Sequence, residues 1–351
     1  MKTKSLLLAF AGLGLFACTN EDVNGVADGN ANVTVTINQA VLGSRASQDH
    51  IADDTPVEVK TMNVVLTAGG THVRDLQNVT ESPKQIVFTN VGIPSAMRVS
   101  VNGGDEKLAL TNEIINGGKA APMLCTASGE ADSEGETNKI YQVDPTNYKI
   151  AATPEFQVAR LELSGIKYKT TGLTEGTTAA YSDVKLMGVY VNGVLNSING
   201  DPCKVEGTSA WTSMVGNTFG PESGNLQIYD KINGDAGVAI DGGTAYPTDT
   251  KVIAYNFIPS ETAEQVVLVL SAKAYGEEAP KTYYAAVEKY KVNTTNEPIA
   301  KFAVGNVYSI TNLEFTDEAI TPDPDGEKNV TVTATVTIKT WQEVNTDVEW
   351  K

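Results

Sequence analysis

The chain has 351 residues, enough for two domains of ordinary size, and its content of 41% hydrophobic and 20% charged residues is normal for a globular protein. Asp and Glu number 43 against 26 Lys and Arg, so the net charge is −17 at pH 7. A surface this negative repels phosphate backbones and anionic headgroups, and we therefore expect no nucleic-acid partner.

Residues 1–17 have the pattern of a targeting segment. Two lysines precede an apolar run from 5 to 16, which is too short to span a bilayer as a stable helix. The run ends in LFAC, with an alanine directly before Cys18, although Phe16 is bulkier than the residue usual at its place. This pattern is typical of a bacterial lipoprotein box, so we predict that 1–17 is a signal peptide and that Cys18 becomes the lipidated first residue, carrying palmitate. The alternative is a plain secretory signal with an incidental cysteine.

Beyond the signal, almost every periodic segment alternates with period two. These segments are rich in Val, Ile, Thr and Tyr and are separated by Gly, Asn, Asp or Pro, which predicts strands. The predicted strands are 33–37, 57–66, 85–89, 98–101, 139–143, 155–163, 184–191, 251–258, 265–274, 281–292 and 307–315. Asn192-Gly193 predicts a two-residue hairpin, because both positions of a type I′ turn need positive φ. No segment after residue 18 has a helical apolar period, so we predict an all-β fold of sandwiches.

Two acidic, loop-like stretches suggest how the chain is divided. The stretch 117–138 is rich in loop residues and Thr153-Pro154 follows it, so we predict a domain at 46–152 and a second at 153–351. Residues 316–328 are acidic and proline-rich, and we expect a linker or extended loop there. Their carboxylates lack the spacing of an EF-hand, which favours a solvated turn over a calcium site.

Few residues point to chemistry. Cys125 and Cys203 show no disulfide framework, so we expect two separate thiols; a disulfide formed in an oxidising compartment is the alternative. With the isolated His50 and His72 they do not supply a metal site. We expect both histidines at the surface. No GxSxG, HExxH, P-loop or Rossmann motif is present, so we predict no enzyme and no cofactor.

The two ends of the chain share a pattern. NVTVT occurs at 32–36 and again at 329–333, and chance similarity is the alternative for so short a match. The C-terminal segment alternates without a break, which predicts a strand. Its apolar face comprises Val330, Val332, Ala334, Val336 and Ile338. A groove shaped for one of these strands is therefore suited to the other. Trp341 and Trp350 follow, and we expect them to be apolar anchors; a carbohydrate site is the alternative.

Arg45 lies in VLGSRAS, 41–47, just after the first predicted strand. By itself it is an ordinary loop arginine. Between a lipidated cysteine and two similar terminal strands, however, it predicts proteolysis at Arg45-Ala46. Before the cut, the tethered strand with Val33, Val35 and Ile37 fills its groove at high effective concentration. After the cut, the C-terminal strand of another subunit adds to the open edge. Arginines within predicted strands should be better shielded.

At these residues the chain resembles the FimA-type fimbrillins, the major pilins of the Bacteroidales, whose pili are called type V. The matching segments are LFAC, Arg45-Ala46, APM at 121–123, FQVARLEL at 156–163, GNVYSITNLEF at 305–315, and TVTIKTW followed by VNTDVEW. The resemblance implies two transthyretin-like β-sandwich domains with a C-terminal donor-strand extension at about 329–351. It also implies a propeptide at 18–45, cleavage after Arg45 by an arginine-specific protease, and polymerisation by strand exchange.

The resemblance further implies partners and a location. The partners are copies of the chain and other pilus subunits. The lipidated precursor would reside in the outer membrane, and the cleaved product in an extracellular fimbrium that supports adhesion. A cleavage site together with a donor segment favours a shaft subunit over an anchor or accessory subunit. The competing hypothesis is a surface glycan-binding lipoprotein, which has no need of Arg45 and whose C-terminal strand belongs to its own sheet.

Overall fold

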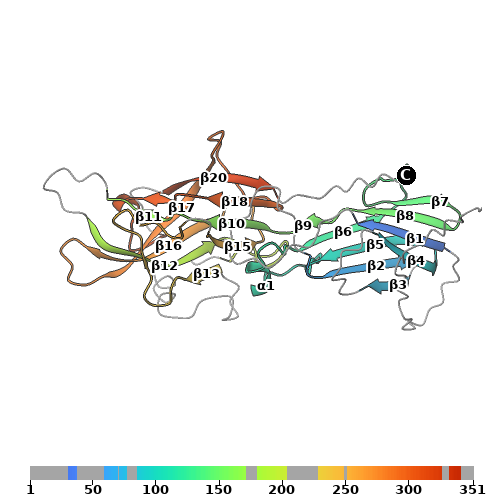
Figure 1. Cartoon of the computed structure of the whole chain (residues 1–351), viewed down its shortest axis with the longest axis horizontal. Helices are drawn as coiled ribbons and strands as arrows, with labels where there is room; N and C mark the ends of the chain where they lie inside the picture. Colours follow the sequence, from blue (N-terminus) through green and yellow to red (C-terminus); the bar gives the residue numbers. More distant parts are fainter. Residues whose placement is uncertain are drawn as a thin grey trace, which may run out of the picture.

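The computed structural model describes residues 31–37, 59–69, 71–76, 85–170, 180–203, 228–248, 251–325 and 332–340, with the backbone alone for 71–76 and 340. The described residues form strands and loops with one four-residue α-helix, α1 (Asn112–Ile115), and one 3-10 turn, η2 (Asp317–Ala319). The predicted all-β class is therefore confirmed (Figure 1).

The strands are numbered in chain order. They are β1 (Ala31–Ile37), β2 (Met62–Ala68), β3 (Thr71–Leu76), β4 (Gln85–Val91), β5 (Pro94–Val101), β6 (Met123–Ser128), β7 (Ile140–Asp144), β8 (Asn147–Ala152), β9 (Glu155–Phe156), β10 (Ala159–Leu163), β11 (Lys167–Tyr168), β12 (Tyr181–Asn192), β13 (Ile228–Lys231), β14 (Val238–Ala239), β15 (Ile253–Phe257), β16 (Gln265–Ala274), β17 (Lys281–Val292), β18 (Asn306–Ile310), β19 (Glu314–Phe315) and β20 (Val332–Thr340).

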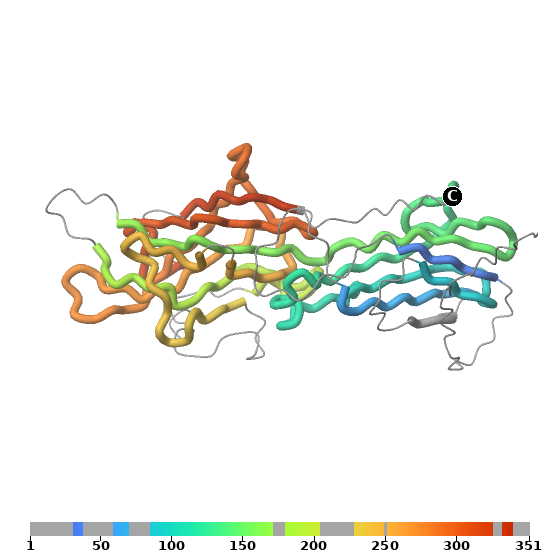
Figure 2. Tube along the Cα trace, viewed as in Figure 1, coloured from blue at the N-terminus to red at the C-terminus, as the bar shows by residue number. Residues whose placement is uncertain are grey.

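The strands pair in two groups. In the first, a four-stranded sheet has the order β4-β1-β8-β7 and a five-stranded sheet the order β3-β2-β5-β6-β9. In the second, the order β13-β12-β16-β17-β20-β18-β10-β15 forms a large sheet with β14 beside β12, and β11 pairs with β19. Figures 1 and 2 show the two groups at opposite ends of an elongated molecule. Sheet membership changes between β9 and β10; the domain limits 46–152 and 153–351 stay a prediction.

Two predicted strands are broken in the structure. Segment 155–163 divides because β9 pairs with β6 while β10 pairs with β15 and β18, in the other group. Between them, the carbonyl of Val158 accepts a 2.9 Å hydrogen bond from the amide of Gly305. Segment 307–315 likewise divides into β18 and β19. The uninterrupted apolar pattern did not indicate that its halves join different sheets.

Two turn predictions need correction. Stretch 117–138, predicted to be rich in loops, is loop at 117–122 and 129–138, but it contains β6, which pairs with β5 and β9 and buries alternate residues. The hairpin predicted at Asn192-Gly193 is absent from this described part of the chain. Gly193 has φ +99°, but Asn192 is outside the positive-φ region and its amide donates to Gln265 on β16. A type I′ turn needs both residues at positive φ.

The predicted linker at 316–328 is described up to residue 325, and there it packs against the large sheet. Residues 317–319 form η2, and Ile320 is buried. Tyr284 and Thr321 then exchange two backbone hydrogen bonds of 2.8 and 2.9 Å. This segment therefore packs along β17, and residues 326–328 lie outside the described range.

The two groups of strands meet through a buried polar network. On β10, Arg160 Nε donates to Glu162 Oε1 at 2.9 Å, and both side chains are at most 4% exposed. Asn256 on β15 is fully buried and donates from Nδ2 to the carbonyl of Gly118 at 3.0 Å. Because Gly118 follows α1, this bond ties the first group of strands to the second. Arg160 Nη1 also donates to Asn256 Oδ1 at 3.4 Å, which connects the ion pair to this amide.

Candidate functional site

The strongest candidate site is the place that β1 occupies in the four-stranded sheet. β1 lies between β4, which runs antiparallel to it, and β8, which runs parallel. Each of residues 33–36 is paired in the ladder with both neighbours. The strand comes from the far N-terminal end of the described chain, yet it holds an interior position in the sheet (Figure 1).

The side chains of β1 fit that place with strict alternation. Val33 and Val35 are fully buried and Ile37 is 2% exposed, while the threonines between them are half-buried on the outer face. Period-two alternation puts the three apolar groups on one side of the strand. They join the same hydrophobic core as Phe88 on β4 and Ile150 on β8. The role of Val33, Val35 and Ile37 as the apolar face of a displaceable strand stays a prediction.

The C-terminal strand β20 lies in the chain's own large sheet. Val332 to Val336 pair with β17 in parallel, and 337–340 then pair with β18 in antiparallel. In the ladder register, each residue of β20 is therefore paired with one neighbouring strand only. The first half of β20 pairs with the strand on one side, and the second half pairs with the strand on the other side. β20 shares with β1 the combination of one parallel and one antiparallel partner, but β1 is held from both sides along most of its length.

The apolar face of β20 is buried along part of its length. Val332, Ala334 and Val336 are at most 6% exposed, whereas Ile338 on the same parity is 37% exposed. Ile338 is paired with Tyr308 on β18. The sequence predicted one continuous apolar face, and the structure leaves its last described member at the surface. An exposed isoleucine on a strand has apolar area that another site can bury.

The described residues cover only part of the predicted site. Cys18, Arg45, Ala46, Val330 and Trp341 lie outside them, as do Trp350 and His50. Arg98 lies within β5 and Arg160 is buried within β10. Their position in paired strands agrees with the expected shielding of these arginines from proteases.

An aromatic cluster beneath β20 was not predicted. Tyr290 and Tyr308, on the two strands that flank β20, both pack on Phe302, with ring centroids 5.0 and 4.3 Å away. The hydroxyl of Tyr290 donates to the backbone carbonyl of Glu264 at 2.6 Å. Burial raises the pKa of the Glu264 carboxyl to about 8, against a backbone hydrogen bond from Ser260 that acts in the opposite sense. The three aromatic residues are widely spaced in the sequence, so no local pattern indicated that their rings pack together.

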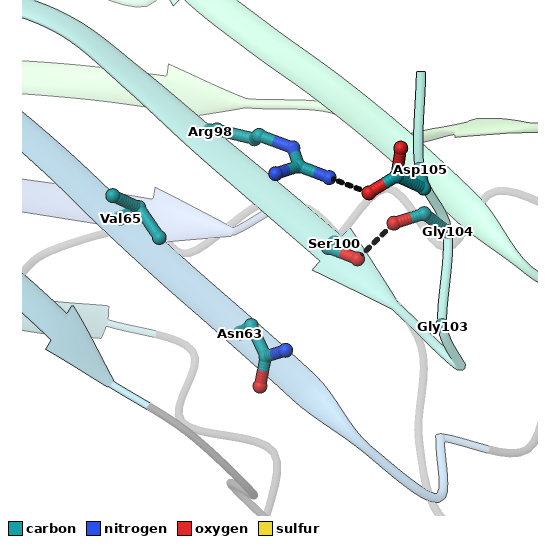
Figure 3. A pocket seen from close by; sticks show the side chains of 7 residues that line it. All are labelled: Asn63, Val65, Arg98, Ser100, Gly103, Gly104 and Asp105. Atoms are coloured by element: carbon teal, nitrogen blue, oxygen red, sulfur yellow. Dashed lines mark hydrogen bonds and ion pairs between the residues drawn. The ribbon is translucent and has the colours of Figure 1, made fainter. Parts of the chain in front are cut away.

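A shallow polar cavity lies on the five-stranded sheet (Figure 3). Arg98 on β5 donates to Asp105 at 2.7 Å, and the hydroxyl of Ser100 donates to the carbonyl of Gly104. The backbone amide of Lys107 and the Arg98 guanidinium lower the pKa of the Asp105 carboxyl. These contacts hold the turn after β5 against the strand. They do not form a pair of groups suited to general acid–base catalysis.

The predictions on cysteines and metals can be compared with the described residues. Cys125 is buried and Cys203 is half-buried, and both are free thiols, so the expected separate thiols are confirmed. Burial raises the pKa of Cys125 to about 12, which keeps the thiol protonated and unreactive. Within the described ranges there is no cluster of three metal-ligating side chains and no helix that is long and apolar enough to cross a membrane.

Comparison with known proteins places the fold. No family model matches the sequence, and no curated protein matches it. The fimbrilin FimA from Porphyromonas gingivalis matches with a TM-score of 0.53 at 13% identity, over 92% of this chain and 100% of that chain. A candidate cell adhesion protein from Bacteroides eggerthii matches with a TM-score of 0.51 at 14% identity, over 91% and 98% of the two chains. The predicted resemblance to the FimA-type fimbrillins is confirmed at the level of the fold.

Proposed function

We propose that this protein is a structural pilin, a shaft subunit of a type V fimbria. The observation that supports the proposal best is the place of β1. A strand from the N-terminal segment fills an interior position of a sheet whose other members come from residues 85–152. If this N-terminal segment is removed, the sheet loses an interior strand, and a strand of another subunit can pair with the two edges that are exposed.

In this proposal, processing controls when that place opens. The chain is exported as an outer-membrane lipoprotein with Cys18 lipidated, and β1 fills its groove in the precursor. An arginine-specific protease cuts Arg45-Ala46, 8 residues after the end of β1. While tethered, β1 excludes competitors by its high effective concentration. Once cut, it dissociates by dilution, and the C-terminal strand of a second copy takes its place in the extracellular fimbrium.

One observation favours a second candidate, a surface lipoprotein that binds glycans. In the structure, β20 belongs to the chain's own sheet, as that hypothesis requires of the C-terminal strand. In the pilin proposal the same position is a storage site, which β20 leaves when a groove becomes available. The two proposals therefore differ in whether cleavage at Arg45 makes β20 change partners. An anchor or accessory subunit of the same pilus differs in keeping its lipid or in not donating a strand.

The test uses the chain from residue 19, which lacks the lipid. After limited trypsin treatment, we expect a preferred cut at Arg45-Ala46, followed by slow formation of SDS-resistant ladders. Arg45→Ala should stay monomeric, while Arg45→Lys, which trypsin still cuts, should form ladders. A chain that is cut at Arg45 yet stays monomeric, and that binds oligosaccharides when uncut, would support the glycan-binding candidate instead. Ladders formed by Arg45→Ala would overturn the role of cleavage.

A further inference from the structure

The tetrapeptide TVTI occurs in both strands, at 34–37 and at 335–338. In β1 its valine and isoleucine, Val35 and Ile37, are buried and its threonines face outward. In β20 its valine, Val336, is fully buried, so the same parity faces inward. The repeat therefore places like residues on like faces of the two strands.

Extending this alignment over β1 keeps the apolar content unchanged. The inward residues of 31–37 are Ala, Val, Val and Ile, and those of 332–338 are Val, Ala, Val and Ile. The outward residues are Asn, Thr and Thr in β1 and three threonines in β20. The two strands thus present the same set of inward side chains, but alanine and valine change places at the first two inward positions. Cores tolerate exchanges that conserve total volume, and here Ala334 takes the place of the fully buried Val33 while Val332 takes the place of Ala31.

A competing alignment is set by NVTVT, at 32–36 and 329–333. That alignment would put Ala334 where β1 has Ile37, which is 2% exposed. A buried isoleucine replaced by alanine leaves a cavity in the core, and cavities are costly. The TVTI alignment instead puts Ile338 there. It buries the one described apolar residue of β20 that its own sheet leaves 37% exposed.

We propose that a second copy's β20 occupies the β1 groove in the TVTI register, with Val336 in the place of Val35 and Ile338 in the place of Ile37. The inference rests on the proposed function and fixes how the two copies fit. The incoming strand runs antiparallel to β4 and parallel to β8, as β1 does. Position 335 takes the place of Thr34, which is paired with Val87 on β4.

The test is a disulfide between copies. In a Cys203→Ser background, one preparation carries Thr335→Cys and the other Val87→Cys, whose side chain is 54% exposed in the wild type. Directly opposed residues of an antiparallel pair lie close enough for a disulfide. After trypsin treatment of the mixture, we expect a 335–87 cross-link in at least tenfold higher yield than in a matched mixture with Thr331→Cys, which the NVTVT register puts opposite Val87.

The outcomes separate the register from the proposed function. Ladders with a preferred 331–87 cross-link, or ladders with neither cross-link, would overturn the TVTI register and leave the pilin proposal intact. Absence of ladders from the cut wild-type chain would overturn the pilin proposal itself. Before cleavage no 335–87 cross-link should form, because Thr335 is then paired with Lys291 on β17.

A second measurement uses Ile338 directly. Ile338→Ala should change the urea midpoint of the uncut monomer little, since the side chain is partly exposed there, but it should lower the SDS-resistant fraction of the ladder at least tenfold. Thr337→Val, on the outward face, is the matched control and should leave both readings near those of the wild type. Equal ladder resistance for Ile338→Ala and the wild type would contradict burial of Ile338 in the groove.

Discussion

A single buried substitution, Val35→Ala, should weaken the binding of β1 in its groove. Val35 is fully buried and is paired with both β4 and β8. Removing two methyl groups forfeits about 1.6 kcal/mol of transfer free energy, and the residual cavity raises the loss to about 2–3 kcal/mol. At 1.4 kcal/mol per tenfold, the affinity of the cut strand for its groove should fall roughly 30- to 140-fold.

The assay follows the release of the N-terminal peptide after cleavage at Arg45, by mass or by a fluorophore at its first residue. Because affinity changes within one interface appear mainly in the dissociation rate, Val35→Ala should release the peptide faster by most of that factor, and ladders should form sooner. The control is Thr34→Val, which keeps a β-branched side chain on the outward face and should release near the wild-type rate. If Val35→Ala and Thr34→Val release at the same rate, inward burial does not hold β1, and the reasoning fails.

Three further predictions concern stability. Burial raises the pKa of Glu264 to about 8 from an ordinary 4.5. Between those values the folded state keeps a proton that the unfolded state loses, so the contribution of Glu264 to stability is fully present below pH 4.5 and falls by about 1.4 kcal/mol per pH unit up to about pH 8. Glu264→Gln should remove this part of the slope in urea midpoints taken at pH 5 and pH 8; an unchanged slope would refute the assignment. Asn256→Ala should cost about 1–3 kcal/mol in urea unfolding, because it removes a buried side-chain amide that donates to the carbonyl of the half-buried Gly118; a cost under about 0.5 kcal/mol would mean that the link is dispensable. A Cβ at Gly104 would lie 2.0 Å from the carbonyl oxygen of Met123, so Gly104→Ala should destabilise by more than about 3 kcal/mol, whereas Gly103→Ala, with φ +78° and open space, should cost about 1–2 kcal/mol. Similar losses for the two glycine variants would contradict this contact.

The sequence predicted strands best where one sheet holds the whole segment. The bounds of β16 and β17 match their predicted ranges, because each runs unbroken through the large sheet. Segment 155–163 was misjudged because hydrophobic alternation does not record a change of sheet. The inward-facing residues of β1 were visible from their period, but β8, which forms one side of its groove, was not predicted. Pairing between residues more than a hundred positions apart follows from topology, and a single sequence carries little signal for it.

Ladder pairing gives strand exchange a direction. β20 is held by one neighbouring strand at a time in its own sheet, while the β1 place offers hydrogen bonds on both sides of 33–36. A backbone hydrogen bond contributes about 0.5–1.5 kcal/mol net, and the β1 place offers two more ladder pairs than β20 has in its own sheet, so a strand that moves there gains about 1–3 kcal/mol before ordering costs. Tethered β1 opposes that gain with its effective concentration, which cleavage removes. In the proposed pilus, therefore, the protease supplies no new contact; it ends the competition that keeps β20 in its own sheet.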